Sequence, residues 1–254
     1  MAWASVLVAV AVLLIALVVL RRKGKDDEGD YSASSLDFAA NLALAAYLLV
    51  LAYAAVLVYD ASGAAESDAL AESESLTELY WAVAPLPDSE QIRSQIKAYT
   101  TETIQLDWPR MSEGELAQEP ARTLEDLRAS IMNLRPVSDA DKELRSTALD
   151  RISDVTHARV VRADDAGSSL DNIFMISLVL SGLVVIVLPW FARARPTVAS
   201  VAGDVVRVGV VVGGILIILV MEHPYSGMKA VQPEAFAVAR EQYEQIDRRF
   251  PGAP

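Results

Sequence analysis

Six residues recur at steps of three or four between positions 41 and 59 and therefore share one face of a helix. They are polar at the ends of the row and mostly small between, and we call them the alanine stripe: Asn41, Ala45, Leu48, Ala52, Ala55 and Tyr59. Such a face suits the lining of an ion pore, with Asn41 inside and Tyr59 at the outer mouth. Small residues also mark close helix packing in membranes, so this second interpretation stays open.

Carboxylates without a basic neighbour follow the stripe along the chain. This acidic cluster comprises Asp60, Glu66, Asp68, Glu72 and Glu74. Repeated around a symmetric oligomer, the charges would form a vestibule that concentrates cations over an axial opening. The alternative is an ordinary solvated face on an exported domain.

Other charged residues have candidate roles of a different kind. We expect Arg159 and Arg162 to pair with the acidic helix, because both lie on one face of the segment that precedes the third apolar stretch. Asp204 and Arg207, spaced i,i+3, can neutralise each other near the membrane boundary. Histidine titrates near neutral pH, so His157 and His223 are candidate pH sensors; an exposed histidine without such a role is the alternative.

The chain offers little for catalysis. It has no cysteine and two histidines, which excludes disulfides, thiol nucleophiles, iron–sulfur clusters and a His-rich metal site. The run Ser94-Gln95-Ile96-Lys97 matches a short hydrolase pattern, but the elements that accompany that pattern in such enzymes are absent. We therefore expect no enzymatic activity, no cofactor and no metal.

The residues above must be positioned by membrane helices, because 53% of the 254 residues are hydrophobic while 22% are charged. Stretches free of Asp, Glu, Lys and Arg cover residues 2–20, 38–59, 172–192 and 208–221. About 20 apolar residues cross a bilayer. Extending the last stretch back to Val198, we expect an all-α protein with four transmembrane helices, at 1–20, 37–59, 170–192 and 198–221.

Residues 60–169 form an acidic segment, with 22 acidic and 11 basic residues. This balance disfavours nucleic acid as a partner and favours cations or basic proteins. Helical periodicity predicts an array of helices over 62–84, from Asp88 to about Leu106, over 124–134, and from Ser138 into the third span. A short amphipathic helix is expected between about Pro233 and Ile246, within the tail 222–254.

Basic residues near the membrane predict the orientation. They lie in the loop 21–36 and in the connection 193–197, which we expect to be cytoplasmic. The N-terminus, the acidic segment and the tail are then outside the cell membrane, although Arg151, Arg159 and Arg162 count against this assignment.

Several short motifs occur together in a specific order. They are Leu79-Tyr80 to Leu86-Pro87, Asp107–Met111 followed by Gly114, the Arg159 and Arg162 pair, and His223–Gly227 followed by Pro233 and Phe236. In this layout the chain resembles a bacterial family of membrane proteins described as bestrophin-like, over roughly Leu36 to Gln245. The family name is an analogy to pentameric anion channels, so the resemblance implies a homo-oligomeric channel.

The sequence thus favours an oligomeric membrane ion channel, cation-preferring because its outer vestibule is acidic, and pH-sensitive. The expected partners are further copies of the chain, membrane lipid and monovalent cations, with no nucleic acid. Gly209 and Gly213 form a GxxxG face, widened by Gly214, that argues for a helix interface. The alternative is a membrane-anchored sensor or scaffold whose acidic helices bind a basic partner.

Overall fold

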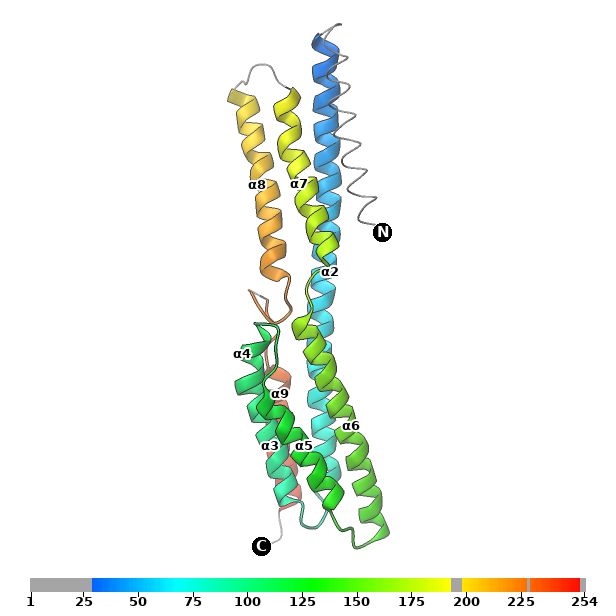
Figure 1. Ribbon diagram of the computed structural model, residues 1–254. Coiled ribbons are helices and arrows are strands. Elements are labelled where there is room, and N and C mark those ends of the chain that lie inside the picture. The colour runs from blue at the N-terminus through cyan, green and yellow to red at the C-terminus, as the bar shows by residue number, and fades with distance from the viewer. Residues whose placement is uncertain (1–28, 193–197, 228, 252–254) are drawn as a thin grey trace. The chain divides into compact units, whose positions relative to one another are not determined.

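The computed structural model describes residues 29–192, 198–227 and 229–251. Every regular element in these ranges is helical (Figure 1), in agreement with the expected all-α class. The elements are α2 (Gly29–Val83), α3 (Glu90–Glu102), the π-helical turn η1 (Thr103–Asp107), α4 (Trp108–Met111), α5 (Gln118–Asn133), α6 (Asp139–Gly167), α7 (Asn172–Ala192), α8 (Val198–Met221) and α9 (Glu234–Arg249).

Three helical stretches of the described chain are long and apolar enough to cross a membrane. They fall within Phe38–Val83, Asp139–Pro189 and Val201–Met221, and their apolar parts are residues 38–59, α7 and α8. The first expected span, 1–20, lies outside the described residues. The structure therefore contains three of the four expected membrane helices as candidates.

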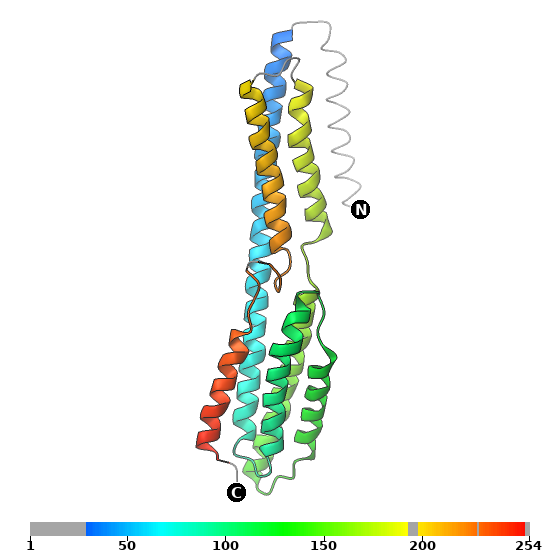
Figure 2. The same cartoon turned by 90° about the vertical axis from the view of Figure 1, so that its left-hand side faces the viewer.

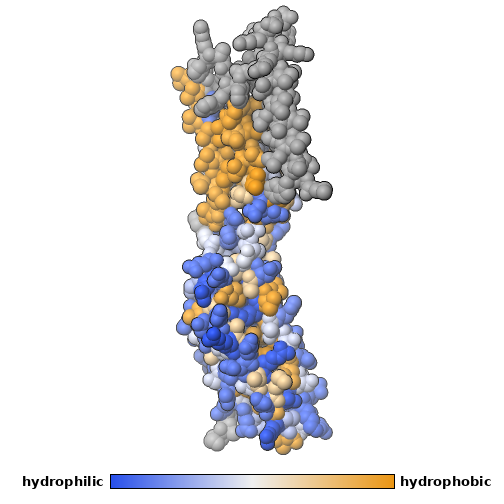
Figure 3. Space-filling model, in the orientation of Figure 1, coloured by the Kyte–Doolittle hydropathy of each residue, from blue (hydrophilic) through white to orange (hydrophobic). Residues whose placement is uncertain are grey.

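The described chain divides into two compact units. Unit 1 contains the N-terminal part of α2 as far as Leu57 together with residues 170–219, and unit 2 contains residues 58–169 and 220–254. In unit 1, α2 runs beside α7 and α8 (Figures 1 and 2). On the face shown in Figure 3, the surface over α7 and α8 is mostly hydrophobic, as a surface that contacts lipid requires.

Tyr47 holds the helices of unit 1 together. Its side chain is fully buried, and its hydroxyl donates a 2.9 Å hydrogen bond to the carbonyl of Val211 on α8. Gly182 of α7 and Gly214 of α8 leave the room that this ring occupies, since a Cβ atom at Gly214 would lie 2.7 Å from the Tyr47 hydroxyl. The packing of unit 1 thus depends on two glycines that face one aromatic side chain.

Unit 2 has a hydrophobic core built from five helices. The C-terminal part of α2 contributes Leu76 and Leu79, α3 Ile96, α5 Leu127, α6 Ile152 and α9 Tyr243, all with no exposed surface. Helix α9, expected only as an amphipathic element of the tail, is thereby an integral part of this core. The unit buries apolar side chains from every one of its long helices, as an independently stable domain does.

Several helix boundaries differ from the sequence expectation. Helix α2 begins at Gly29, inside the expected loop 21–36, and continues without a break to Val83. Asp88 was expected to cap the second helix of the acidic segment, but Ser89 occupies that position and Asp88 has a φ of +56°, so the chain turns once more before α3 begins. The last helix of the array, α6, was expected to continue into the third span. It ends at Gly167, and residues 168–171 separate it from α7, where the Asp171 carboxylate accepts a 3.0 Å hydrogen bond from the Ile173 amide. Glycine and serine are poor helix formers, and an aspartate at a helix start satisfies a free amide.

Candidate functional site

A group of charged side chains and one tyrosine lies buried in the middle of unit 2, and we call it the arginine cluster. It comprises Glu72 on α2, Tyr99 on α3, Asp107 at the end of η1, and Arg159 and Arg162 on α6. The Arg162 guanidinium contacts the Glu72 carboxylate through Nε at 2.7 Å and Nη2 at 3.1 Å, and Asp107 Oδ2 through Nη2 at 3.2 Å. The side chains of Arg162, Glu72 and Asp107 have no exposed surface.

Asp107 links both arginines to the loop before α5. Arg159 is ion-paired with Asp107, and its Nη2 also donates to the Ala117 carbonyl at 3.0 Å. The Ala117 amide in turn donates to Asp107 Oδ1 at 2.8 Å. Two carboxylates therefore neutralise two guanidiniums, and a buried charge is tolerated only when paired and hydrogen-bonded in this way.

The π-helical turn η1 explains how Asp107 reaches the cluster. Pro109 has no backbone N–H, and its ring would clash with a carbonyl in a regular α-helix. The helix widens just before it, where the Trp108 amide bonds to the Thr103 carbonyl, five residues back. The extra residue in the turn shifts the helix face, and both Thr103 and Asp107 are buried.

The surroundings shift the pKa values of Arg162 and Tyr99 in the cluster. Burial alone would lower the pKa of Arg162, but the negative charge of Glu72 and its hydrogen bonds raise that pKa above its usual value, so Arg162 stays charged. Burial, reinforced by the charge of Glu72, raises the pKa of Tyr99, so its hydroxyl keeps its proton and donates to Glu72 Oε1 at 2.5 Å. The rings of Trp108 and Phe236 lie 5.6 and 5.5 Å from the Arg162 guanidinium carbon.

The acidic cluster predicted from the sequence is not uniform in the structure. Asp60, Glu66 and Glu74 are exposed, and Asp68 is half-buried. Glu72 lies instead in the arginine cluster with no exposed surface, because α2 turns this residue towards α6. Its charge is neutralised by Arg162. Glu72 therefore does not belong to the acidic surface that was expected to form the vestibule.

The alanine stripe lies on the uncovered side of α2. Asn41, Ala45, Leu48, Ala52 and Ala55 are all exposed in unit 1, while Ala40, Tyr47 and Ala54 on the opposite side are buried. Tyr59, which belongs to unit 2, is 64% exposed and has the Lys229 Nζ 5.9 Å from its ring centroid. Within the part of unit 1 that the structure describes, the stripe is therefore not buried against α7 or α8.

The remaining predicted residues fall in separate places. His157 is exposed on α6, and His223 is half-buried in the loop after α8. In unit 1 the Arg207 Nη1 lies 3.8 Å from Asp204 Oδ1, and the Arg207 Nη2 donates to Asn41 Oδ1 at 2.8 Å. Arg207 thereby contacts the first residue of the alanine stripe.

Two groups in unit 2 were not identified as sites from the sequence. Asp247 on α9 accepts hydrogen bonds from Tyr80, Arg93 and Lys97; burial alone would raise its pKa, but these bonds hold the pKa below its usual value. Asp165 lies within hydrogen-bonding reach of Asp68, and burial together with the Asp68 charge raises the pKa of Asp165 to about 6. Neither group shows a sequence signal, since the partners are 90 or more residues apart.

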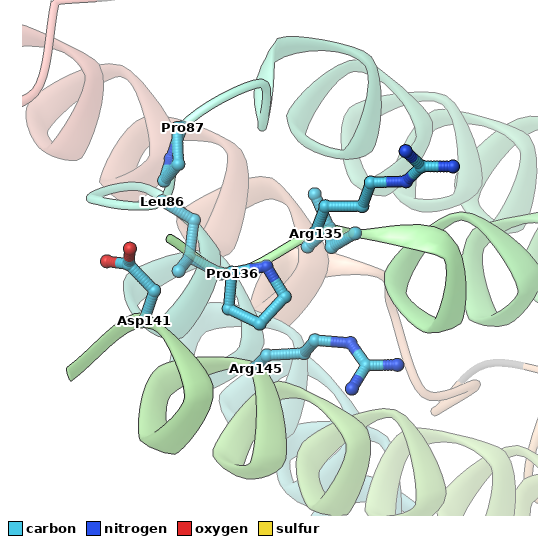
Figure 4. Close-up of a pocket in the computed structure, with 7 residues that line it drawn as sticks. Leu86, Pro87, Arg135, Pro136, Asp141 and Arg145 are labelled. Atoms are coloured by element: carbon cyan, nitrogen blue, oxygen red, sulfur yellow. The ribbon is translucent and has the colours of Figure 1, made fainter. Parts of the chain in front are cut away.

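Two recesses of unit 2 are lined partly by charged residues whose side chains already bind other groups of the protein. Figure 4 shows one beside Leu86, Pro136 and Arg145, with room for about 10 Å³, no more than one water molecule. Its Arg145 donates to the Ile131 and Met132 carbonyls at the end of α5. A second recess contains Ser94 and Lys97 of the hydrolase-like run, but the Lys97 Nζ is held by Asp247 at 2.5 Å. In the described ranges no group of three or more potential metal ligands comes together.

Three helices of the described chain are long and apolar enough to cross a membrane, which indicates a helical membrane protein, and its unit 2 is organised around buried arginines. A family model described as the Bestrophin-like domain matches residues 5–236, nearly the whole chain, so the protein belongs to the bestrophin-like family. No curated protein and no solved structure matches the chain.

Proposed function

We propose that the protein is a homo-oligomeric ion channel whose alanine stripes face a common axis. The observation that carries this proposal is the exposure of Asn41, Ala45, Leu48, Ala52 and Ala55. If these alanines served to pack α2 against α7 or α8, they would be buried there, and in the described residues they are not. Three or four spans enclose too little space for a hydrated path, so a pore requires several copies around the stripe.

Cation preference is the second part of the proposal. Asp60, Glu66 and Glu74 are exposed on α2, and residues 60–169 have a net charge of −11 from 22 acidic and 11 basic residues. A ring of such carboxylates raises the local concentration of cations. The membership in a bestrophin-like family supports a channel rather than an enzyme, while the charge of this segment argues for cations.

The proposal places the chain in the cell membrane as a multi-pass protein, with the N-terminus, unit 2 and the tail outside. It also includes proton sensitivity. His157 and His223 were the candidates for this property from the sequence, and the Asp68 and Asp165 pair is a further candidate, because one of its carboxyls titrates at a pKa of about 6.

The test is ion flux through the purified protein in liposomes. We expect Na⁺ or K⁺ to pass faster than Cl⁻, and the double substitution Asp60→Asn with Glu66→Gln to reduce the ratio of cation to anion flux. The effect should shrink in about 1 M salt, where the Debye length falls to about 3 Å. As a matched control, Glu119→Gln with Glu125→Gln removes two exposed charges from α5 and should leave the ratio unchanged. Flux no greater than that of empty liposomes, over a range of voltage and pH, would exclude the channel.

A membrane-anchored sensor or scaffold is the second candidate function. It is favoured by the independent core of unit 2 and by the acidic residues exposed on that unit, which suit a basic partner. A scaffold needs no path through the membrane. A closed protomer interface without a pore, seen in a structure of the detergent-purified oligomer, would support it over the channel.

A further inference from the structure

Asp204 and Arg207 are the only Asp, Glu, Lys or Arg residues in the apolar stretches 38–59, 172–192 and 198–221. Their side chains are 26% and 17% exposed, so both charges are largely withdrawn from the surface of unit 1. An ionised residue withdrawn from the surface of an apolar unit is costly and is usually retained for a role in transport. The structure shows what this arginine contacts.

Arg207 reaches towards the exposed side of α2. Its Nη2 donates to Asn41 Oδ1 at 2.8 Å, and Asn41 is an exposed residue of the alanine stripe. Helices α2 and α8 are already joined on the buried side of α2 by the 2.9 Å hydrogen bond from the Tyr47 hydroxyl to the Val211 carbonyl. The contact with Asn41 therefore joins Arg207 to the stripe itself, on a different face of the helix from Tyr47, about 120° around the axis.

The bond fixes the orientation of the Asn41 amide. A guanidinium only donates, so the atom of Asn41 that faces Arg207 must be its oxygen, and the NH₂ group is left as a donor. Asp204 balances the charge from the α8 side, with its Oδ1 3.8 Å from Arg207 Nη1, a longer separation than the Asn41 contact. At this end the stripe is consequently backed by a positive charge and presents N–H donors.

We propose that Arg207 is a selectivity-determining residue, which acts through Asn41 to admit small inorganic anions and to slow cations at this end of the stripe. The inference rests on the proposed function, since it requires the alanine stripe to line the path. It goes beyond that function because it adds a positive charge beside the path. The carboxylates after Tyr59 favour cations, and Arg207 lowers the ratio of cation to anion permeability. A guanidinium beside a narrow path acts in this way by repelling cations and attracting anions.

The experiment is the reversal potential of the reconstituted full-length protein under a NaCl gradient. Arg207→Gln keeps an N–H donor for the Asn41 oxygen and removes the charge, so the permeability ratio of Na⁺ to Cl⁻ should rise by at least about threefold. Arg207→Lys keeps the charge and should leave the ratio within about a factor of 1.5 of the original value. Asp204→Asn removes the balancing negative charge and should shift the ratio in the opposite direction, towards Cl⁻.

Each outcome decides a different statement. If the unmodified protein conducts and Arg207→Gln and Asp204→Asn both leave the permeability ratio unchanged, Arg207 is only a packing residue and the inference is wrong, while the channel stands. If the unmodified protein does not conduct, the proposed function fails and the inference fails with it. Native mass spectrometry of each variant reports whether the oligomer is retained. If Arg207→Gln fails to assemble, the permeability ratios of Asp204→Asn and Arg207→Lys are compared instead. A ratio shifted towards Cl⁻ in Asp204→Asn but not in Arg207→Lys supports the inference, and an unchanged ratio in Asp204→Asn contradicts it.

Discussion

The arginine cluster joins three elements of unit 2 through buried ion pairs. Arg162 contacts two carboxylates from different elements, Glu72 of α2 and Asp107 of η1, and all three side chains lack exposed surface. Loss of one partner from a buried ion pair typically costs about 3–5 kcal/mol, because the remaining charge stays in the interior unpaired. The cluster therefore links α2, η1 and α6 within unit 2.

A pH-dependent contact is expected at Asp165, on α6 three residues after Arg162. Burial and the charge of Asp68 raise the pKa of Asp165 to about 6, above the value of 3.8 of an unperturbed carboxyl. The folded protein thus binds a proton here that the unfolded chain releases at lower pH. Stability from this pair is complete below the unfolded pKa and is lost as the pH rises through about 6.

Replacement of Asp165 by Asn removes this titration. We expect the melting temperature of the Asp165→Asn variant to change less than that of the unmodified protein between pH 4.5 and pH 7, with the variant gaining most at pH 7. The measurement is thermal unfolding in one detergent at several pH values. Asp150→Asn replaces an exposed carboxylate of the same helix and serves as the control. Parallel pH profiles for the unmodified protein and Asp165→Asn would show that the Asp68 and Asp165 contact does not titrate in this range.

At the scale of the helix, neighbouring glycines of α8 face different environments. A Cβ at Gly214 would lie 2.7 Å from both Leu51 Cδ2 and the Tyr47 hydroxyl, whereas a Cβ at Gly209 or Gly213 meets no atom within 4 Å. Gly214 therefore packs against Tyr47 and Leu51 inside unit 1. The Gly209 and Gly213 face is open in the described structure, and an open GxxxG face suits contact with a further helix.

The two glycines separate folding from assembly in an experiment. We expect Gly213→Leu to retain the helical content and thermal stability of the protein and to shift native mass spectra towards smaller assemblies, because the leucine projects where another backbone would approach. Gly214→Leu should lower the melting temperature, since it collides with Tyr47 and Leu51. Unaltered assembly of Gly213→Leu would remove this face from the oligomer interface, and a strictly monomeric unmodified protein would remove the ground for an axial pore.

Helix positions followed well from the sequence, and helix faces less well. Apolar length and proline punctuation located α8 at Val198–Met221 and the start of α6 after Ser138, whose side chain and Asp141 form a reciprocal capping box. The break at 168–171 was missed, because it depends on weak local preferences. Glu72 was grouped with its exposed neighbours since periodicity tells which residues share a face but not which face is buried.

The candidate site shows the same limit in its long-range contacts. The sequence indicated that Arg159 and Arg162 lie on one face and would meet the acidic helix, and the structure places Arg162 against Glu72. The sequence did not indicate that Asp107 would bind these arginines, although the motif Asp107-Trp108-Pro109 was recognised. The reason is physical: a π-helical turn before a proline shifts the face of a helix, and that shift is invisible to a periodicity of 3.6.

At the scale of the whole molecule, the proposed function depends on the side of the membrane that unit 2 occupies. An acidic vestibule above an axial path affects entry from the outside only if unit 2 is extracytoplasmic. The basic residues of 21–36 and 193–197 support that orientation. Arg151, Arg159 and Arg162 had counted against it; of these, Arg159 and Arg162 are ion-paired inside unit 2.

Because the chain has no cysteine, single cysteine replacements can report the orientation directly. We expect Ser112→Cys and Ser153→Cys, both at exposed positions of unit 2, to react with a membrane-impermeant thiol reagent in intact cells, and Ser32→Cys, in the expected cytoplasmic loop, to react only after the cells are opened. Tyr99→Cys is the control for access, since position 99 is fully buried and should not react until the protein is unfolded.

The reverse pattern, with Ser32→Cys labelled in intact cells and Ser112→Cys protected, would place unit 2 in the cytoplasm. The acidic residues would then lie at the inner mouth and Asn41 with Arg207 towards the outside, so that cations would be concentrated on the cytoplasmic side and the charge asymmetry along the stripe would be inverted.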